Sequence, residues 1–480
     1  MIIGRNCINP NIVLHRVDDN FDIVQSIDYV EFCGMINFWK MFFVEQYDAK
    51  PGERAFIVGV PGYDYYGAVF AAMELGIVLI LDWPHCYNEE DLTNSKVSMF
   101  GTIDYVVYVD DFSPEENNEW DNKRNKMYSR HVITFDDIKR YNIKDGSRYK
   151  EISDRIITDP EAIVVEYPSS GTTGHPKLIT NTHKKIYLMS QRIGRMFKFT
   201  KDDRIMHITN LNHGHGLCLH FLPGFMLSND HYSRTPNNFM QFVRFINDQK
   251  INRMLLYTGK LLLDFLGQTE KLYHPLHVLT LYQITPDVLR AVREKGIAQV
   301  NSTFGDTAIG AGFLLKTETP DTDLTNYSPS NYGPRVDDFW QLDIRDGVLW
   351  VKSTELEQDW MTSNDQFDII NNEYYFRGRS DSYKINNEWV VLNQIESKVR
   401  ELFGTDANIT VDLDYQKIYL AVWKTNSISE SALAQFFKTT YSDVNVSYVL
   451  RNENPAEFFN SRKIDNSKIR DYCRKRLNLI

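Results

Sequence analysis

The sequence lacks the features that mark several large classes of protein. No two of its five cysteines form a Cys-x-x-Cys pair. Scattered cysteines favour a reducing compartment and give no zinc motif. The longest apolar stretch, residues 65–81, is interrupted by Glu74, which argues against a membrane span. The cysteines are Cys7, Cys33, Cys86, Cys218 and Cys473.

An excess of positive charge is also missing. The formal net charge is −11, which argues against a nucleic-acid partner and requires that any ATP site be made locally positive. Residues 1–6 lack the apolar core of a secretory signal. We therefore expect a cytoplasmic protein with neither nucleic acid nor membrane as a partner.

One stretch of small residues, 166–177, follows the apolar run 162–165. Its glycines allow close backbone approach, its hydroxyls donate hydrogen bonds and its lysine neutralises negative charge. A stretch of this composition could also be a flexible surface loop. The order Ser-Ser-Gly-Thr-Thr-Gly-x-Pro-Lys favours a phosphate loop instead. It is not a Walker A loop, because Gly-x-x-x-x-Gly-Lys-Ser/Thr does not occur. The predicted phosphate-binding residues are Ser169, Ser170, Gly171, Thr172, Thr173, Gly174 and Lys177.

The hydrophobic pattern predicts an α/β protein. A chain of 480 residues is too long for one core, so two or three domains are expected. Strand 55–60, helix 63–75 and strand 77–81 form a βαβ signal, and such units imply a parallel sheet. Apolar spacing also predicts a helix around residues 29–47, and a helix over residues 184–196 with Thr182 as its N-cap. The alternation continues to a strand at residues 299–303, and from residue 331 a period of two predicts hairpins. We expect a large N-terminal domain of parallel βαβ sheets with a small β region, followed by a small α+β C-terminal domain.

Six segments, in order, carry a resemblance to a known family. The chain resembles the adenylate-forming, AMP-binding superfamily, and its pattern is most similar to acyl- and aryl-CoA synthetases. The segments are residues 73–80, the phosphate loop with Thr182-His183 after it, Phe304-Gly305-Asp306-Thr307, the turn at 346–352, Gly378-Arg379-Ser380-Asp381 and Lys463-Ile464-Asp465.

The resemblance implies a role for each matched residue. Phe304 stacks on adenine beside Gly305, and Thr307 binds the α-phosphate. Asp365 and Arg379 contact the ribose. Lys463 bridges the substrate carboxylate and the α-phosphate as the catalytic lysine.

The resemblance also implies the domain organisation. A large adenylation domain covers residues 1–378, a hinge covers 379–383, and a small mobile domain covers 384–480. Asp381 is the pivot about which the C-terminal domain rotates between the two half-reactions.

His213 bears on the substrate class. Residues 212–216 resemble a motif of acyl- and aryl-CoA ligases, in which the histidine lies beside the acyl pocket. No aspartate holds an α-ammonium group here, so a simple carboxylic acid fits better than an amino acid. A metal site of His213, His215 and His220 is a weaker alternative, because no carboxylate or cysteine accompanies these histidines.

The chain departs from the family pattern at several positions. Ala308 replaces the glutamate that normally helps hold Mg²⁺, so that either Asp306 or water would take its place or metal binding would be weakened. Arg462 stands where the family has a glycine, directly before the catalytic lysine. Residues 265–270 imitate the Phe304 motif by letters, but they lie in a helical pattern and too near the phosphate loop.

These features predict an ATP-dependent ligase. It would form an acyl- or aryl-adenylate from a small carboxylic acid, with Mg²⁺, and transfer the acyl group to the thiol of CoA or of a carrier protein's phosphopantetheine. Direct amide formation, or a degenerate nucleotide-binding protein without turnover, remain the alternatives.

Overall fold

The structure is a computed structural model, and most of the chain is described in it. The described residues are 2–81, 103–109, 129–141, 152, 155–168, 178–208, 211, 216–256, 259–268, 270–281, 284, 286–306, 309–325, 327–328, 330–356, 358–379, 382–385, 388–405, 407–412, 417–423, 429–440, 446–451, 459–460, 463–464 and 466–477.

A sheet of six described strands contains the predicted βαβ unit. Its first five strands pair in parallel, and β7 and β8 pair antiparallel. Helix α2 (Tyr63–Glu74) connects β3 to β4, and Gly76 follows it with φ 72°, as expected of a glycine at a helix end. The sheet order is β6 (Ser129–Ile133), β5 (Ile103–Tyr108), β3 (Arg54–Val58), β4 (Val78–Ile80), β7 (Ile163–Pro168) and β8 (Leu178–Thr182).

A second sheet of eight described strands is parallel in its centre and antiparallel at both edges. Helices α11 (Phe239–Asp248), α12 (Gly259–Leu266) and α13 (Pro286–Lys295) alternate with its strands. The sheet order is β14 (Gly310–Glu318), β13 (Gln299–Asp306), β12 (His277–Thr280), β11 (Arg253–Leu255), β9 (Arg204–His207), β10 (Asp230–Ser233), β1 (Val13–Val17) and β2 (Ile23–Asp28).

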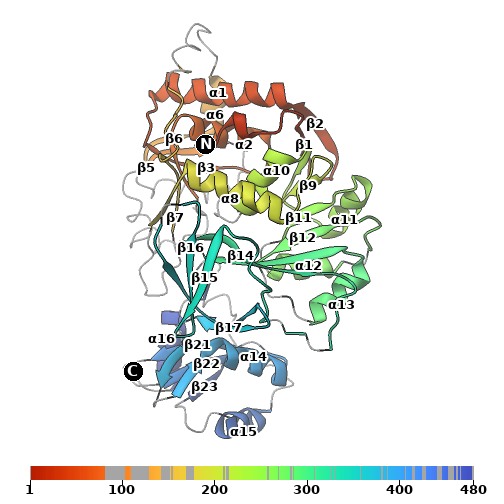
Figure 1. The fold of residues 1–480 in the computed structure, drawn as a ribbon, viewed down its shortest axis with the longest axis vertical. Helices are drawn as coiled ribbons and strands as arrows, with labels where there is room; N and C mark the ends of the chain where they lie inside the picture. Colours follow the sequence, from red (N-terminus) through yellow and green to blue (C-terminus); the bar gives the residue numbers. More distant parts are fainter. Residues whose placement is uncertain are drawn as a thin grey trace.

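The largest apolar core contains residues from both sheets and from the helices between them. Helix α1 (Tyr29–Tyr47) lies where the sequence predicts it. Asp28 Oδ1 accepts from the Glu31 backbone N–H at 2.9 Å, and Glu31 Oε2 accepts from that of Asp28 at 3.0 Å, which is a capping box. Helix α8 (His183–Met196), the π-helix η4 (Leu217–Phe221) and α10 (Leu222–Leu227) also contribute to this core. Figure 1 shows α8 between the first sheet and β14.

The predicted β hairpins form a separate four-stranded sheet of β15 (Trp340–Arg345), β16 (Val348–Ser353), β17 (Met361–Ile370) and β18 (Glu373–Arg379). Asp346 and Gly347 both have positive φ, 52° and 78°, and so do Asn371 and Asn372, 53° and 64°. Two successive residues with positive φ make the tight turns that match the twist of antiparallel strands.

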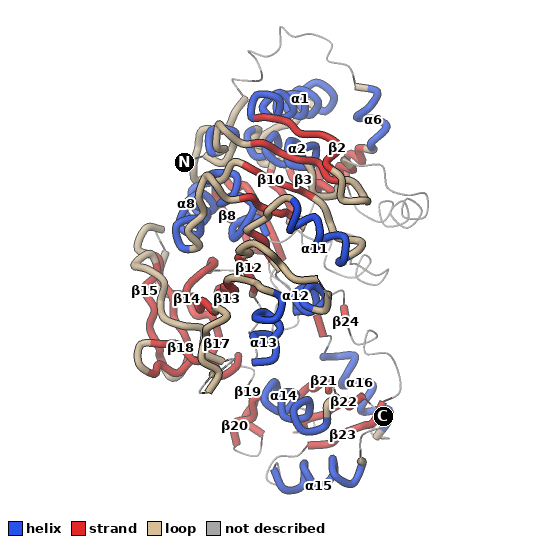
Figure 2. The backbone as a smooth tube through the Cα atoms, turned by 90° about the vertical axis from the view of Figure 1, so that its right-hand side faces the viewer, coloured by secondary structure: helices blue, strands red, loops and turns tan. Residues whose placement is uncertain are grey.

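Beyond residue 391 the described chain forms an α+β unit with its own cores. Figure 2 shows this unit at the lower end of the molecule. The boundary at residue 378 stays a prediction. The unit comprises α14 (Leu392–Phe403), β21 (Ala407–Asp412), β22 (Lys417–Trp423), α15 (Glu430–Thr440), β23 (Val446–Arg451) and α16 (Asn466–Arg476), preceded by the hairpin of β19 (Ser382–Ile385) and β20 (Glu388–Val391). Between β23 and α16 in the sequence, β24 (Phe459–Asn460) pairs with β25 (Lys463–Ile464) as a separate two-stranded sheet. Over the described ranges, no helix combines the length and the apolarity needed to cross a membrane.

Candidate nucleotide-binding site

The two residues predicted to contact ribose lie opposite each other on neighbouring strands. Asp365 on β17 pairs in register with Arg379 on β18. Asp365 is only 2% exposed, and its backbone N–H donates to Ser363 Oγ at 3.1 Å. A buried carboxylate accepts hydrogen bonds only, so this position suits a ligand that donates hydroxyl protons.

The predicted adenine residue lies in the same neighbourhood. Phe304, at the end of β13, is half-buried, and its ring centroid is 4.9 Å from that of Phe367, two residues after Asp365. The rings of Tyr332 and Phe376 lie 5.2 and 6.0 Å from it. The fold therefore brings the predicted base-binding and ribose-binding residues together from distant parts of the sequence.

The hairpin that carries Phe304 requires glycine at position 305. A Cβ atom on Gly305 would lie 2.8 Å from Ala311 Cα and 2.9 Å from the Gly310 carbonyl oxygen, which is closer than backbone atoms tolerate. Asp306 Oδ1 accepts from the Ile309 backbone N–H at 3.0 Å and so closes the hairpin. Strand β13 thus runs three residues further than the predicted strand, which ended at Thr303.

Several predicted site residues lie outside the described part of the chain. They are the whole phosphate loop from Ser169 to Lys177, and His213, Thr307, Ala308 and Asp381. The ends of the loop are nevertheless placed, because Pro168 on β7 pairs with Leu178 on β8. Lys463 lies in β25, and the structure describes its backbone alone.

The helix after the phosphate loop begins as predicted. Thr182 Oγ1 accepts from the Lys185 backbone N–H at 3.3 Å, which makes Thr182 the N-cap of α8. The Ile3 backbone N–H donates to His183 Nδ1 at 3.0 Å, so the N-terminal segment anchors the start of this helix. Burial lowers the pKa of His183 to about 4, which keeps the ring neutral near pH 7.

Lys185 is a candidate site residue that the sequence patterns missed. Burial lowers its pKa, whereas its electrostatic interactions with Cys218 and the Asp306 carboxylate raise it. Asp306 also interacts electrostatically with Tyr167, which precedes the phosphate loop. Lysine is disfavoured in the first turn of a helix by the helix dipole, and this is the signal that could have identified Lys185. Its neighbour Lys184 instead forms an outward ion pair with Glu161 at 2.9 Å.

Three buried histidines, His207, His220 and His231, lie close to one another. His207 and His231 share a hydrogen bond of 2.9 Å, and the His220 ring lies 5.1 Å from that of His207. Burial lowers the pKa of His220 and of His231 to about 3, and that of His207 well below its usual range. Among the described residues, no group of three or more His, Cys, Asp or Glu could hold a metal ion. His213 and His215 of the alternative metal set fall outside the described residues.

The described donors fit one part of a magnesium site. Mg²⁺ beside ATP needs one or two carboxylates, with phosphates and water as its other ligands. Asp306 is the described carboxylate next to Thr307 and Ala308, and its Oδ1 already accepts a backbone hydrogen bond. Asp306 is therefore the described carboxylate nearest in the sequence to Ala308, which replaces the family's glutamate.

A sequence profile of the AMP-binding enzyme family matches residues 25–346. This match spans more than half of the chain and includes the phosphate loop, Phe304 and Thr307. The chain therefore belongs to the AMP-binding enzyme family.

Known proteins add similarity at two levels. The mitochondrial malonate–CoA ligase of Xenopus laevis is 41% identical over 49 residues, which cover 10% of this chain and only 8% of that protein. The o-succinylbenzoate coenzyme A synthetase of Bacillus subtilis, bound to AMP, has a TM-score of 0.74 at 16% identity, with 97% of this chain and 96% of that chain covered. An amide bond synthetase from Marinactinospora thermotolerans has a TM-score of 0.72 at 14% identity, with 98% of both chains covered. These two structures establish the adenylate-forming fold for this chain.

Proposed function

We propose that this chain uses ATP to activate a carboxylic acid as an acyl- or aryl-adenylate, releases pyrophosphate, and transfers the acyl group to a thiol. The thiol belongs to CoA or to the phosphopantetheine of a carrier protein. Family membership supports the adenylation step, and the acid and the acceptor are part of the proposal.

One observation carries the proposal to particular residues: Asp365 pairs in register with Arg379 on the neighbouring strand, and the ring cluster that contains Phe304 lies beside it. An apolar ring surface next to a buried hydrogen-bond acceptor is the combination that a nucleoside needs. The base stacks, and the ribose hydroxyls donate to the carboxylate.

In the first half-reaction, a carboxylate oxygen attacks the α-phosphorus of ATP and the bond to the β-phosphate oxygen breaks. Positioning and charge neutralisation account for most of the catalysis in such a transfer. Residues 169–177 would hold the β- and γ-phosphates, Thr307 the α-phosphate, and Lys463 would stabilise the charge that develops between acid and phosphate. Mg²⁺ would neutralise phosphate charge, with Asp306 as the carboxylate next to Thr307.

In the second half-reaction, the thiol sulfur attacks the acyl carbon, the bond to AMP breaks and the thiol proton is lost. The proposed hinge at Asp381 would let residues 384–480 reorient between the two steps. His213 would lie beside the acyl group and the incoming thiol.

The adenylate can be trapped directly. The protein is incubated with ATP and single carboxylic acids of different size, and hydroxylamine is added to capture an activated acyl group as its hydroxamate. Hydroxamate and AMP formed in equal amounts with at least one acid support the proposal. If the protein binds ATP but forms AMP with none of the acids, the result would support the degenerate nucleotide-binding alternative.

The acceptor is identified in the same reaction. Adding CoA, a phosphopantetheinylated carrier protein or a simple amine in place of hydroxylamine distinguishes a thioester from an amide by mass. An amine is included because the chain shares its fold with an amide bond synthetase. An amide product without any thioester would contradict the thiol acceptor.

A further inference from the structure

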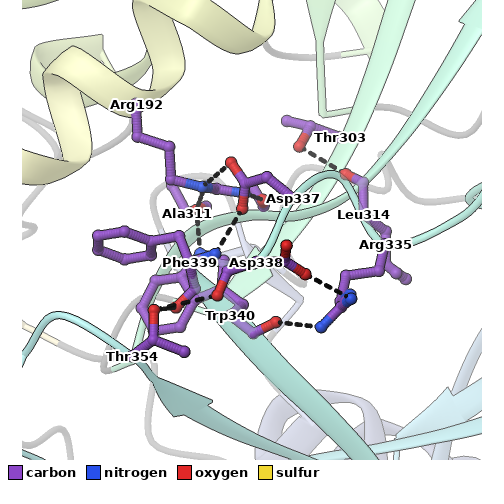
Figure 3. Close-up of polar contacts among 11 residues, drawn as sticks. Arg192, Thr303, Ala311, Leu314, Arg335, Asp337, Asp338, Phe339, Trp340 and Thr354 are labelled. Carbon is purple, nitrogen blue, oxygen red and sulfur yellow. Dashed lines mark hydrogen bonds and ion pairs between the residues drawn. The ribbon is translucent and has the colours of Figure 1, made fainter.

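Arg192 is a fully buried cation at the junction of three parts of the fold. It extends from α8, and its side chain is 1% exposed. Its Nε donates to Asp337 Oδ2 at 2.6 Å and its Nη1 to the Ala311 carbonyl oxygen at 3.1 Å, and Nη2 donates to the Gly312 carbonyl oxygen. Figure 3 shows these contacts together with the rings of Phe339 and Trp340.

The rings complete the enclosure of the guanidinium group. Its central carbon lies 5.3 Å from the Phe339 ring centroid and 5.9 Å from that of Trp340. Trp340 Nε1 donates to the same Ala311 carbonyl oxygen at 3.3 Å. A buried charge is costly unless it is paired and hydrogen-bonded. Nε, Nη1 and Nη2 of Arg192 each have a hydrogen-bond partner.

On one side, Arg192 fixes the helix that follows the phosphate loop. Strand β8 leaves that loop and enters α8 at Thr182 without an intervening residue. The start of α8 is held by the bond from Ile3 to His183, and its second half is held by Arg192.

On the other side, Arg192 fixes the strand that follows Thr307. Its two carbonyl acceptors are the second and third residues of β14, directly after the hairpin that contains Thr307. A Cβ atom on Gly312 would lie 2.8 Å from Ile193 Cδ1 and 3.1 Å from Arg192 Nη1, and Gly312 has φ 70°. Helix and strand therefore approach so closely that only glycine fits between them.

We propose that Arg192 is a positioning residue for nucleotide binding, which fixes α8 and the β7–β8 hairpin, whose residues Pro168 and Leu178 flank the predicted phosphate loop, relative to the β13–β14 hairpin. In the proposed function, residues 169–177 bind the β- and γ-phosphates of ATP and Thr307 binds its α-phosphate. ATP therefore has to span the predicted phosphate loop and the β13–β14 hairpin. This inference rests on the proposed function, and it concerns residues that are not themselves assigned to contact ATP.

The chain contains a matched control. Arg253 pairs with Asp203 at 3.1 Å, donates to the carbonyl oxygens of Phe197 and Lys198 at 3.0 Å each, and lies 5.5 Å from the Phe199 ring centroid. It makes the same kinds of contact as Arg192, but it ties β11 to the chain just beyond α8. A purely stabilising arginine is expected to behave like Arg253.

The test compares Arg192→Lys with Arg253→Lys in the full chain. Lysine keeps the charge but cannot serve several acceptors in one plane. Both variants should lower the melting temperature. Arg192→Lys should also raise the Kd for ATP, measured by titration calorimetry, at least tenfold, whereas Arg253→Lys should change it less than twofold. Equal effects of the two variants on the Kd would overturn the inference.

Asp337→Asn provides a second route if Arg192→Lys does not fold. The Asp337 side chain is 36% exposed, so this change is tolerated more easily. We expect a three- to fivefold weaker affinity for ATP, and an unchanged affinity would overturn the inference. A wild-type chain that binds no ATP would contradict the proposed function as well, whereas wild-type binding with unaffected variants contradicts the inference alone.

Discussion

At the scale of single residues, Asp365 is the most informative position. Its carboxylate is buried beside the strand position of Arg379, and hydrogen bonds to charged groups contribute about 1.5–3 kcal/mol. Asp365→Asn should therefore weaken ATP binding roughly tenfold or more, as measured by titration calorimetry. Asp343→Asn, in the same sheet but half-exposed beside Arg345, is the control and should leave the affinity unchanged.

The neighbouring lysines of α8 make a second pair of variants. Lys185 is partly buried near Asp306, whereas Lys184 forms a surface ion pair with Glu161. We expect Lys185→Met to slow adenylate formation at least tenfold, because it removes a cation that interacts electrostatically with Asp306, next to the predicted α-phosphate residue Thr307. Folding should be preserved, since methionine does not incur the cost of burying a charge.

Single-turnover formation of AMP measures the effect, and circular dichroism confirms folding. Lys184→Met should react at the wild-type rate. Equal rates for the two variants would show that Lys185 has no part in the reaction.

At the scale of elements, sequence periodicity predicted the positions of α1, α2, α8 and the hairpins to within a few residues. These elements have local signals, namely apolar spacing, the cap at Thr182 and the turn residues Asp346-Gly347 and Asn371-Asn372. The extent of β13 was underestimated, because its last residues become a strand only through pairing with β14, whose glycine-rich start gives no strand pattern.

For the site, motif order predicted Asp365 and Arg379 as ribose contacts and Phe304 as the adenine contact. The fold brings these positions together, and their roles stay predictions. The proposed role of Arg192 was not predictable, because a cation in an amphipathic helix normally lies on the solvated face, whereas Lys185 had a signal that was missed, its place in the first turn of α8. Their partners Asp337, Ala311 and Asp306 come from distant segments that only the tertiary structure brings near.

The β13–β14 hairpin gives a prediction at the element scale. Gly305→Ala should destabilise the protein and weaken ATP binding, since its methyl group would collide with the backbone of Gly310 and Ala311. Gly34→Ala, in the interior of α1 with nothing within 4 Å of the new Cβ, should instead stabilise by about 0.5–1 kcal/mol. Urea unfolding measures both changes, and a Gly305→Ala protein as stable as the wild type would contradict the observed hairpin geometry.

At the scale of the whole molecule, buried histidines couple folding to pH. The pKa of His183 is lowered to about 4, and the pKa values of His220 and His231 are lowered to about 3. The unfolded chain therefore binds more protons than the folded chain once the pH falls below about 6.5. The stability present above that pH is lost as the pH falls toward the folded-state values, by up to about 1.4 kcal/mol per pH unit for each histidine.

His220→Phe isolates one of these contributions. His220 Nε2 has no hydrogen-bond partner among the described residues, so phenylalanine removes a titrating group and no bond at that atom. The free energy of unfolding of the variant should fall less steeply than that of the wild type between pH 6.5 and 4.5. Parallel curves would mean that His220 does not bind a proton on unfolding.

We propose that the whole molecule forms an acyl-adenylate with Lys463 as its catalytic cation. The most direct test is acid-dependent exchange of labelled pyrophosphate into ATP, measured for the wild type and for Lys463→Ala beside their affinities for ATP. We predict exchange by the wild type with at least one carboxylic acid, and at least a hundredfold slower exchange by Lys463→Ala with a nearly unchanged affinity for ATP. Wild-type binding of ATP without exchange for any acid, or exchange that survives in Lys463→Ala, would contradict this account.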